Sequence, residues 1–503
     1  MSTWDNHRPL IARLVITGTL QLESPAGFGS GDSDGLLDML LLRDAVDNRP
    51  LLPGTSIAGA LRNYLRQRKH GYRAKLRHGE KDEQENGEKD TTEALFGGSK
   101  GNDEGSQSLL IVDDSRAEQS ATIIRDGVRI DPQTRTAQDQ KKFDYELLPA
   151  GTTFPVRLEL LIPTDADEPA LLADLALALD GFTRGEIGMG IRKRRGFGQC
   201  KVATWQVVRY DMQSLEGMLA WLATGLQAPV AGVGGGKPVE LPAAPTTDKR
   251  QQITLKATFE LASPLLIRST EPLGSYAKQP DVIHIRSNGQ PVIPGTSLAG
   301  ALRARAQRIL NTLGLREDIL DNLFGHDMDK PPTEQTASRM DKRPTEHTAS
   351  RLLVAEATIN SPPNYLVQQR VSIDRFTGGS YTAALFSEAP LTCGEVTLTI
   401  RIQGDPKHSP ADRQRELGLL VLLLKDLWLG DLTLGGTSSI GRGRLKGKHA
   451  TLHSTLTDCI GEWKFEQVNG KLQVSGDTAL LQDCVTELSH SPTQSDPRKE
   501  QAA

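Results

Sequence analysis

Residues 51–68 have the sequence LLPGTSIAGALRNYLRQR, and residues 292–309 have the sequence VIPGTSLAGALRARAQRI. In both stretches Pro-Gly-Thr-Ser supplies a turn and a cap, and the apolar side chains that follow recur with helical spacing. The two prolines, Pro53 and Pro294, are 241 residues apart. A long stretch that occurs twice in one chain indicates a duplicated fold.

Three further pairs of segments recur at nearly the same separation. They are LESP (22–25) with LASP (261–264), RIDPQT (129–134) with SIDRFT (372–377), and GFG (196–198) with GRG (441–443). The ordered recurrence predicts a first domain over residues 1–210 and a second over 251–450. Residues 211–250 are predicted to form a helix and a flexible linker, because residues 227–250 are rich in Gly, Pro and Ala. Residues 451–503 are expected to form a C-terminal extension with a disordered tail.

Each repeat has the same predicted order of elements. In the first repeat they are strand 13–23, helix 56–68, strand 153–163, helix 169–182 and strand 199–208. The second repeats the pattern with strand 253–262, helix 297–310, strand 395–402 and helix 415–430. The coarse order within each repeat is β-α-β-β-α-β. This predicts the α+β class, with two tandem ferredoxin-like (RRM-like) domains and inserted loops.

Composition narrows the functional classes. The net charge is −4, so any RNA binding must come from local clusters of Lys and Arg. The four cysteines lie far apart, which argues against a Cys-x-x-Cys zinc or redox site. No long apolar run predicts a membrane span, and the N-terminal MSTWDNHRPLIARL does not resemble a signal peptide. We therefore expect a cytoplasmic protein without a membrane partner.

Two kinds of motif could contact RNA phosphates. The free N–H groups of the helices opened by Pro-Gly-Thr-Ser could hold a phosphate, or the turn could simply cap the helix. The residues of this motif are Ser56, Arg62, Ser297 and Arg303. The glycine-rich segments 185–199 and 435–448 either admit an RNA backbone or form tight turns with a basic edge. Their candidate RNA-binding residues are Arg192, Lys193, Arg194, Arg195, Arg442 and Arg444.

The doubled Pro-Gly-Thr-Ser helix, a Leu-Phe-Gly segment and a terminal Gly-x-Gly loop together resemble the backbone proteins of the RAMP superfamily. The resemblance extends over most of the chain, and two repeats in one chain resemble the fused backbone subunits of type III-D-like CRISPR effectors. It implies that the protein binds CRISPR guide RNA, complementary target RNA and other subunits of a type III effector complex.

The resemblance also implies cleavage of target RNA by a loop aspartate. The matching residues are Asp38 and Asp281, which are 243 residues apart. A carboxylate can act as a base or as a ligand of Mg²⁺ or another divalent cation, with no organic cofactor. Asp32 and Asp34 could help to hold the metal, and His284 could serve as an extra acid or base. An aspartate before a strand is also a common turn residue, and a single strand histidine is commonly structural.

Residues 129–143 and 372–386 match the place where the family extends a β-hairpin thumb that kinks the guide–target duplex. The candidate RNA-binding residues there are Arg129, Arg135, Lys141, Lys142, Arg370 and Arg375. Phe143, Phe376 or Tyr381 could wedge against displaced bases. Alternatively, these residues pack on a neighbouring subunit.

Three functions compete at this point. The first is an endoribonuclease that works within a ribonucleoprotein, and the second is a structural subunit that holds the guide without cutting. The third is a guide-maturation nuclease of the same superfamily, which is disfavoured because the ten histidines form no repeated constellation near the glycine-rich loops.

Overall fold

The computed structural model describes most of the chain. The described residues are 9–33, 37–77, 88–98, 107–131, 134–224, 236–269, 280–315, 317–326, 349–362 and 366–490. The chain divides into a first unit that ends at Arg250 and a second that begins at Gln251, with Pro132–Arg135 and Arg194–Gly196 grouped with the second. Each unit has its own main hydrophobic core. Within the described part of the chain, no helix is long and apolar enough to cross a membrane.

The elements of the first unit follow in the order β1 (Leu10–Leu22), β2 (Leu51–Leu52), α1 (Gly54–His70), β3 (Leu76–Arg77), β4 (Glu88–Lys89), α2 (Glu93–Phe96), β5 (Leu110–Val112), β6 (Ser115–Arg116), β7 (Ile123–Ile130), β8 (Ala137–Leu147), β9 (Thr153–Pro163), α3 (Glu168–Thr183), η1 (Lys193–Arg195), β10 (Cys200–Asp211), α4 (Leu215–Thr224) and β11 (Lys237–Pro238).

The main sheet of the first unit has the strand order β11-β10-β1-β9-β5, and β1 is antiparallel to both of its neighbours. Helices α1 and α3 pack against each other and against this sheet. Successive side chains of a strand point to opposite faces. Leu14 and Ile16 of β1 therefore enter the core beneath the two helices, while Val15 packs with Ala220 of α4.

The second unit contains β12 (Gln252–Leu261), β13 (Arg268–Ser269), β14 (Val282–His284), β15 (Arg286–Ser287), β16 (Gln290–Ile293), α5 (Gly295–Leu313), α6 (Asp318–Phe324), β17 (Leu352–Val354), β18 (Ala357–Asn360), β19 (Gln368–Ile373), β20 (Ser380–Ala389), β21 (Glu395–Gln403), α8 (Pro410–Leu429), η2 (Ser438–Ile440), β22 (Leu445–Ser454), β23 (Gly461–Val468), β24 (Lys471–Ser475) and α9 (Thr478–Ser489).

The second unit repeats the topology of the first. β12 lies between β21 and β22, while β17 and β18 pair with the far edge of β21. Helices α5 and α8 supply the two helices of the repeat. In the first unit β1 lies between β9 and β10, and in the second β12 lies between β21 and β22. The first strand thus lies between the two strands that flank the second long helix, which is the ferredoxin-like arrangement. The predicted tandem ferredoxin-like fold is confirmed.

The second unit also carries additions. β23 and β24 extend the sheet beyond β22, and α9 packs on α8. Trp463 of β23 is fully buried, and its indole N–H donates to the carbonyl of Asp477 at the start of α9. The C-terminal extension is therefore part of the fold as far as His490. The sequence predicts a disordered tail after about residue 485, whereas α9 continues to Ser489, and the rest of that tail, residues 491–503, lies outside the described residues.

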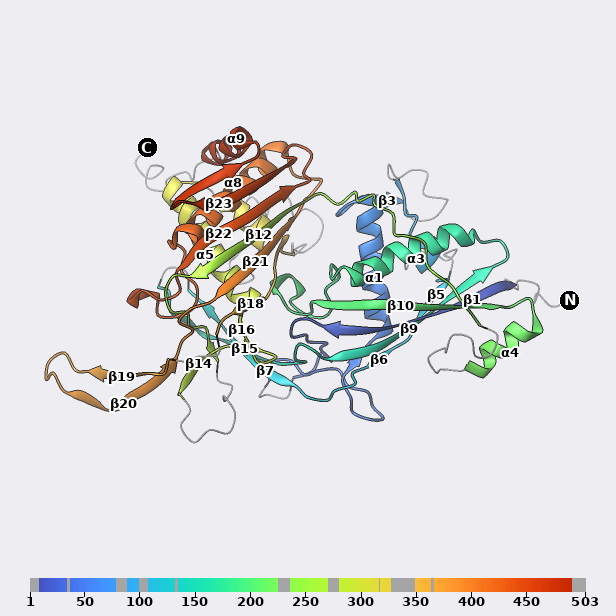
Figure 1. The fold of residues 1–503 in the computed structure, drawn as a ribbon, viewed down its shortest axis with the longest axis horizontal. Coiled ribbons are helices and arrows are strands. Elements are labelled where there is room, and N and C mark those ends of the chain that lie inside the picture. The colour runs from blue at the N-terminus through green and yellow to red at the C-terminus, as the bar shows by residue number, and fades with distance from the viewer. Residues whose placement is uncertain are drawn as a thin grey trace, which may run out of the picture. The chain divides into compact units, whose positions relative to one another are not determined.

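Both predicted hairpins are present. β7 pairs with β8 in the first unit, and β19 pairs with β20 in the second. Figure 1 shows β19 and β20 as a two-stranded ribbon that extends away from the main sheet of the second unit. In that ribbon Asp374 accepts a hydrogen bond from the backbone N–H of Phe376 in the turn.

Residues 236–250 lie along the first unit. β11 pairs with β10, and the backbone N–H of Val239 donates to the carbonyl of Val207 (3.0 Å). Arg68, which is 2% exposed, donates to the carbonyl of Pro245 (3.1 Å). Arg250 donates to Glu186 at 2.7 Å. The described part of the predicted flexible linker is therefore held along its length by contacts with the first unit.

Candidate nucleic-acid interface

The two candidate catalytic aspartates lie at the base of the two hairpins. Asp38 Oδ2 accepts a hydrogen bond from the backbone N–H of Asp144 in β8 (2.8 Å), and the Asp38 backbone N–H donates to the Asp144 carbonyl (3.0 Å). Asp281 Oδ2 accepts from the backbone N–H (2.7 Å) and the hydroxyl (3.0 Å) of Ser387 in β20. Both aspartates are exposed.

We call the hydrogen bonds that hold each aspartate to its hairpin strand the aspartate clamp, and the two clamps are equivalent. The aspartate and its partner are 106 residues apart in each unit. In both cases Oδ2 is the carboxylate oxygen that accepts the hydrogen bonds, among the residues that the structure describes. The Ser387 backbone N–H, followed by its hydroxyl, lowers the pKa of Asp281 below its usual value. The fold thus positions Asp38 and Asp281 alike, as their register in the sequence predicted.

The surroundings of Asp38 are mixed in charge. Lys142 lies 3.2 Å from Asp144, whose backbone holds Asp38. Arg192 stacks over Phe143, with 4.2 Å between the guanidinium carbon and the ring centroid, and donates to the Tyr145 hydroxyl at 2.7 Å. Asp32 is exposed, and the predicted contribution of Asp34 lies outside the described residues.

The surroundings of Asp281 are more basic. Glu388 follows Ser387 in β20 and is 1% exposed. Its carboxylate accepts from Arg442 (2.8 Å) and lies 3.2 Å from Arg370 Nε and 3.7 Å from Arg268 Nη2. Three guanidinium groups therefore surround one carboxylate.

His284 is a structural residue. It is 3% exposed, Nδ1 accepts from the backbone N–H of Ile267 (3.1 Å), and Nε2 lies 2.9 Å from the Val292 carbonyl. Burial lowers its pKa to about 4. The ring is therefore neutral at pH 7 with the proton on Nε2, and both nitrogens are occupied. It serves the packing of β14 and not as an extra acid or base.

The two glycine-rich segments fold back on their own backbones. Gly198 and Gly443 have φ values of +68° and +78°. A Cβ atom at Gly198 would lie 1.7 Å from the carbonyl oxygen of Met189, and one at Gly443 would lie 1.9 Å from that of Leu434. These glycines are required by the turn itself. The tight-turn interpretation therefore explains the glycines but not the basic residues.

The basic residues of these segments differ in exposure. Arg192, Lys193 and Arg444 are exposed, and Arg194 and Arg195 are half-buried. Arg442 is 3% exposed, and its guanidinium donates to Glu388 and, at 2.7 Å, to Gln368 Oε1. The prediction that Arg442 contacts RNA is wrong for this reason: it fastens the glycine-rich loop to the base of the hairpin.

The helix-opening motifs are also partly structural. The backbone N–H of Gly54 donates to the Asp114 carboxylate at 2.7 Å, so the first free N–H group of α1 is already used. Ser56 is exposed, whereas Ser297 and Arg62 are half-buried. Arg303 donates to the Gly325 carbonyl at 3.0 Å, which links α5 to the end of α6. The arginine that follows the motif in the second unit therefore has a structural role that the sequence did not indicate.

The hairpins present most of the remaining candidates to solvent. Arg135, Lys141, Lys142 and Arg375 are exposed, and Arg129 and Arg370 are half-buried. Phe376 at the tip of the second hairpin is 99% exposed and Tyr381 is 57% exposed. Phe143 is half-buried and packs on Gly127, where a Cβ atom would lie 2.2 Å from its ring. Of the three aromatic candidates, Phe376 and Tyr381 are thus the accessible ones.

Comparison with protein families matches the RAMP superfamily over residues 19–201 and 258–446. The chain belongs to the RAMP superfamily. One match falls in each ferredoxin-like unit, and each contains its aspartate clamp and glycine-rich loop. RAMP proteins are CRISPR-associated and RNA-binding, and some are ribonucleases. A comparison with curated proteins found no match.

Sequence reasoning missed several residues of this RAMP protein's candidate site. Asp144 and Ser387 form the hydrogen bonds that hold the two aspartates, and Glu388 forms ion pairs with three arginines. Arg268 on β13 lies outside the motifs that the sequence singles out. No local signal marks these residues, because strand pairing brings them to the aspartates across more than a hundred residues of chain or from a separate short strand.

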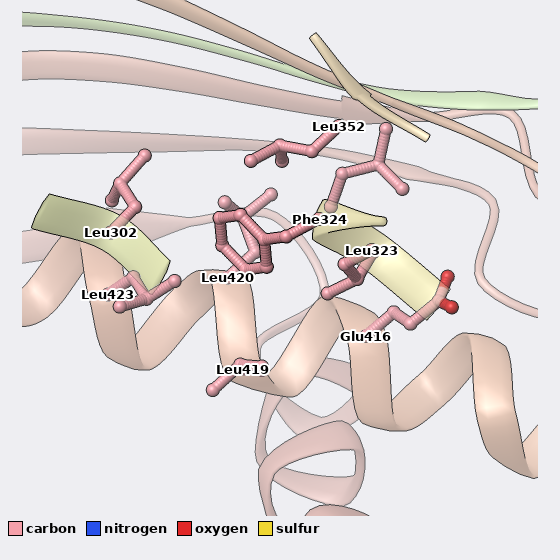
Figure 2. A pocket seen from close by; sticks show the side chains of 9 residues that line it. Leu302, Leu323, Phe324, Leu352, Glu416, Leu419, Leu420 and Leu423 are labelled. Carbon is pink, nitrogen blue, oxygen red and sulfur yellow. The ribbon is translucent and has the colours of Figure 1, made fainter. Parts of the chain in front are cut away.

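A small apolar hollow in the second RAMP unit is a packing gap. Figure 2 shows leucines from α5, α6 and α8 gathered around Phe324, with Glu416 at one end. Glu416 is 2% exposed and pairs with the buried Arg351. The single carboxylate that lines the hollow is paired with Arg351 within the core, and the other residues that line it are apolar.

Proposed function

We propose that this RAMP protein is a backbone subunit of a type III CRISPR effector, with two backbone units fused in one chain as in type III-D-like systems. It binds the CRISPR guide RNA along both units, receives complementary target RNA and contacts other subunits of the complex. The two family matches, each containing a two-stranded hairpin, support this proposal.

We further propose that each unit cuts the target RNA at its loop aspartate. The observation that carries the proposal is the equivalent clamping of Asp38 and Asp281 at the two hairpin bases. One carboxylate oxygen is fixed by a backbone N–H group, while the side chain remains exposed. Catalysis requires this combination, because a reacting group must be both held and accessible.

The proposed reaction uses the nucleophile that RNA itself carries. The 2′-OH attacks the adjacent phosphorus and loses its proton, the bond from phosphorus to the 5′ oxygen breaks, and that oxygen takes up a proton. The products are a 2′,3′-cyclic phosphate and a 5′-OH end. The lowered pKa of Asp281 suits a carboxylate that stays ionised and holds a cation or the 2′-OH, and makes it a weak base.

A divalent cation fits this arrangement when it arrives with the RNA. Among the described residues no group of three or more metal-binding side chains occurs. Mg²⁺ is commonly bound by one or two carboxylates with phosphate oxygens and water. Asp38 with its neighbour Asp144 would supply two carboxylates and Asp281 would supply one. Bound Mg²⁺ would add positive charge at the phosphate, and the proposal involves no organic cofactor.

Exposed cations would form the RNA-binding surface. On the described surface they are Arg135, Lys141, Lys142, Arg192, Lys193, Arg375 and Arg444, with Arg62, Arg129, Arg194, Arg195 and Arg370 half-buried beside them. These side chains would neutralise backbone phosphates. Phe376, which projects from the tip of the second hairpin, would wedge against a displaced base.

A scaffold without catalytic activity is the alternative. The same hydrogen bonds would also serve an aspartate whose task is to close the base of a hairpin. The alternative therefore predicts that both aspartates matter for folding and neither for cleavage.

Target cleavage by the reconstituted complex separates the two functions. We expect Asp38→Ala and Asp281→Ala each to slow one distinct cut by roughly 100-fold or more. Asp38→Asn and Asp281→Asn keep an oxygen that can accept the clamping N–H, so they control for folding while removing the charge. Binding of guide and target should be unchanged. Survival of every cut in the double alanine variant would establish the scaffold function.

A further inference from the structure

We propose that Arg268, together with Arg370, binds a phosphate of the target RNA beside Asp281. This inference rests on the proposed RNA-binding and RNA-cleaving function and assigns a positioning role within the second site.

The groups around Glu388 carry an excess of positive charge. Its buried carboxylate carries one negative charge, and the guanidinium groups of Arg268, Arg370 and Arg442 carry three positive charges. Within the described part of the chain none of these arginines pairs with another carboxylate. Buried Arg442 completes the ion pair inside the protein. Arg268 and Arg370 are left with positive charge in excess.

The three arginines differ in their exposure to solvent. The side chain of Arg268 is 61% exposed and that of Arg370 is 33% exposed, whereas that of Arg442 is 4% exposed. The excess charge therefore faces solvent. A guanidinium offers two parallel N–H groups that match two phosphate oxygens, and this geometry favours phosphate as the ligand.

The strand pairing brings Arg268 and Glu388 close to Asp281. β14 lies between β13 and β20, with Arg268 paired to His284 and Glu388 paired to Val282. Val282 directly follows Asp281 in the chain, and Ser387, which holds Asp281, directly precedes Glu388. A guanidinium that reaches Glu388 therefore lies over the start of β14, next to the aspartate clamp.

The first unit has different residues at the positions of Arg268 and Glu388. Gly29 bridges to Leu41 there, as Arg268 pairs with His284 in the second unit. Tyr145 bridges to Met39, as Glu388 pairs with Val282. The first unit thus has no side chain in place of Arg268 and a tyrosine in place of Glu388. Removal of Arg268 should therefore affect the second site alone.

The first experiment measures both cuts in one reconstituted complex with Mg²⁺. We expect Arg268→Ala to slow the Asp281-dependent cut roughly tenfold, while the Asp38-dependent cut is unchanged. Arg268→Lys should recover part of the rate, because lysine restores the positive charge but lacks the two parallel N–H groups of a guanidinium. Arg308→Ala, which removes an exposed arginine of α5, is the matched control. Arg268→Ala should fold, because Glu388 keeps its ion pairs with Arg370 and Arg442.

The second experiment needs no cleavage. Target RNAs carry a single neutral methylphosphonate, with a 2′-deoxy sugar beside it, at successive positions. At one position the modification should weaken RNA binding to the wild-type complex roughly tenfold. The same modification should not weaken RNA binding to the Arg268→Ala complex. Equal losses in both proteins at every position would overturn the phosphate contact. If the contact holds but Asp281→Ala still cuts, the cleavage proposal fails and the inference stands. If Asp281→Ala stops cutting while Arg268→Ala changes neither readout, only the inference fails.

Discussion

Asp281 and His284 lie three residues apart, and their surroundings shift both pKa values downward for different reasons. Hydrogen bonds from Ser387 favour the charged form of Asp281. Burial disfavours the charged form of His284 and lowers its pKa to about 4. At neutral pH the aspartate is therefore charged and the histidine is not. Neither group changes its protonation near pH 7, although histidine is the residue usually expected to do so.

The first consequence concerns the pH dependence of cleavage. We expect the single-turnover rate of the Asp281-dependent cut to show no inflection between about pH 5 and pH 7, because neither Asp281 nor His284 titrates in that range. The measurement is the rate at closely spaced pH values with a fixed concentration of Mg²⁺. An inflection near pH 6 that disappears in His284→Gln would contradict the structural role of the histidine.

The second consequence concerns stability. The folded pKa of His284 lies below the usual unfolded value near 6.5, so its contribution is complete above pH 6.5 and is lost as the pH falls towards 4. We expect the second unit to lose about 3 kcal/mol more unfolding free energy between pH 7 and pH 4 in the wild type than in His284→Gln. Urea unfolding followed by the fluorescence of buried Trp463 measures the difference; equal losses would disprove it.

At the scale of elements, each hairpin base and its glycine-rich loop form one assembly. In the first unit Arg192 of the loop contacts Phe143 and Tyr145 of β8. In the second, Arg442 of the loop pairs with Glu388 of β20. The loop can approach so closely because its glycines allow the chain to fold back on itself. An arginine from the loop therefore braces the strand that holds the aspartate in both units.

Removing the buried arginine of this assembly should destabilise the second unit. Arg442→Ala leaves Glu388 buried with less compensation, and we expect a loss of about 3 kcal/mol in unfolding free energy. The exposed neighbour Arg444 provides the control, because Arg444→Ala should change stability by less than about 0.5 kcal/mol. Urea unfolding of both variants tests the difference, and equal effects would show that the Arg442–Glu388 pair does not stabilise the fold.

At the scale of the whole molecule, the two units have separate cores. All residues of the main core of the first unit precede Arg250, and all residues of the second follow it. In the second unit Arg351 joins α6, β21 and α8. It donates hydrogen bonds to the carbonyl of Asn322 (3.2 Å) and the carbonyl of Gln403 (2.8 Å), and it forms an ion pair with Glu416. This arginine is part of one core only.

A change at Arg351 should therefore act on one unit. We expect Arg351→Ala to destabilise the second unit by about 3–5 kcal/mol, because it leaves Glu416 buried without its partner. Hydrogen exchange should show faster exchange in β12, β21 and β22, while β1 and β9 keep their protection. Arg308→Ala, on the surface of α5, serves as the control. Faster exchange in β1 and β9 as well would show that the two units unfold together.

Much of the fold could be predicted from the sequence because its signals are local. The repeated Pro-Gly-Thr-Ser helix, the alternating strands and the two hairpin segments all depend on residues close together in the chain. The register of the repeat also located Asp38 and Asp281 at equivalent places. Contacts between distant segments were less accessible: nothing near residues 236–250 indicates that they lie along β10 and Arg68.

The sequence by itself determined the duplicated ferredoxin-like fold and the pair of aspartates, because backbone geometry and repeat register are encoded over short distances. Only the tertiary structure decided which charged side chains are free to meet RNA. Arg442 and Arg444 are two residues apart and look alike in the sequence. Arg442 is buried in an ion pair with Glu388, whereas Arg444 is exposed to solvent. The availability of a charge depends on its partner, and strand pairing chooses that partner.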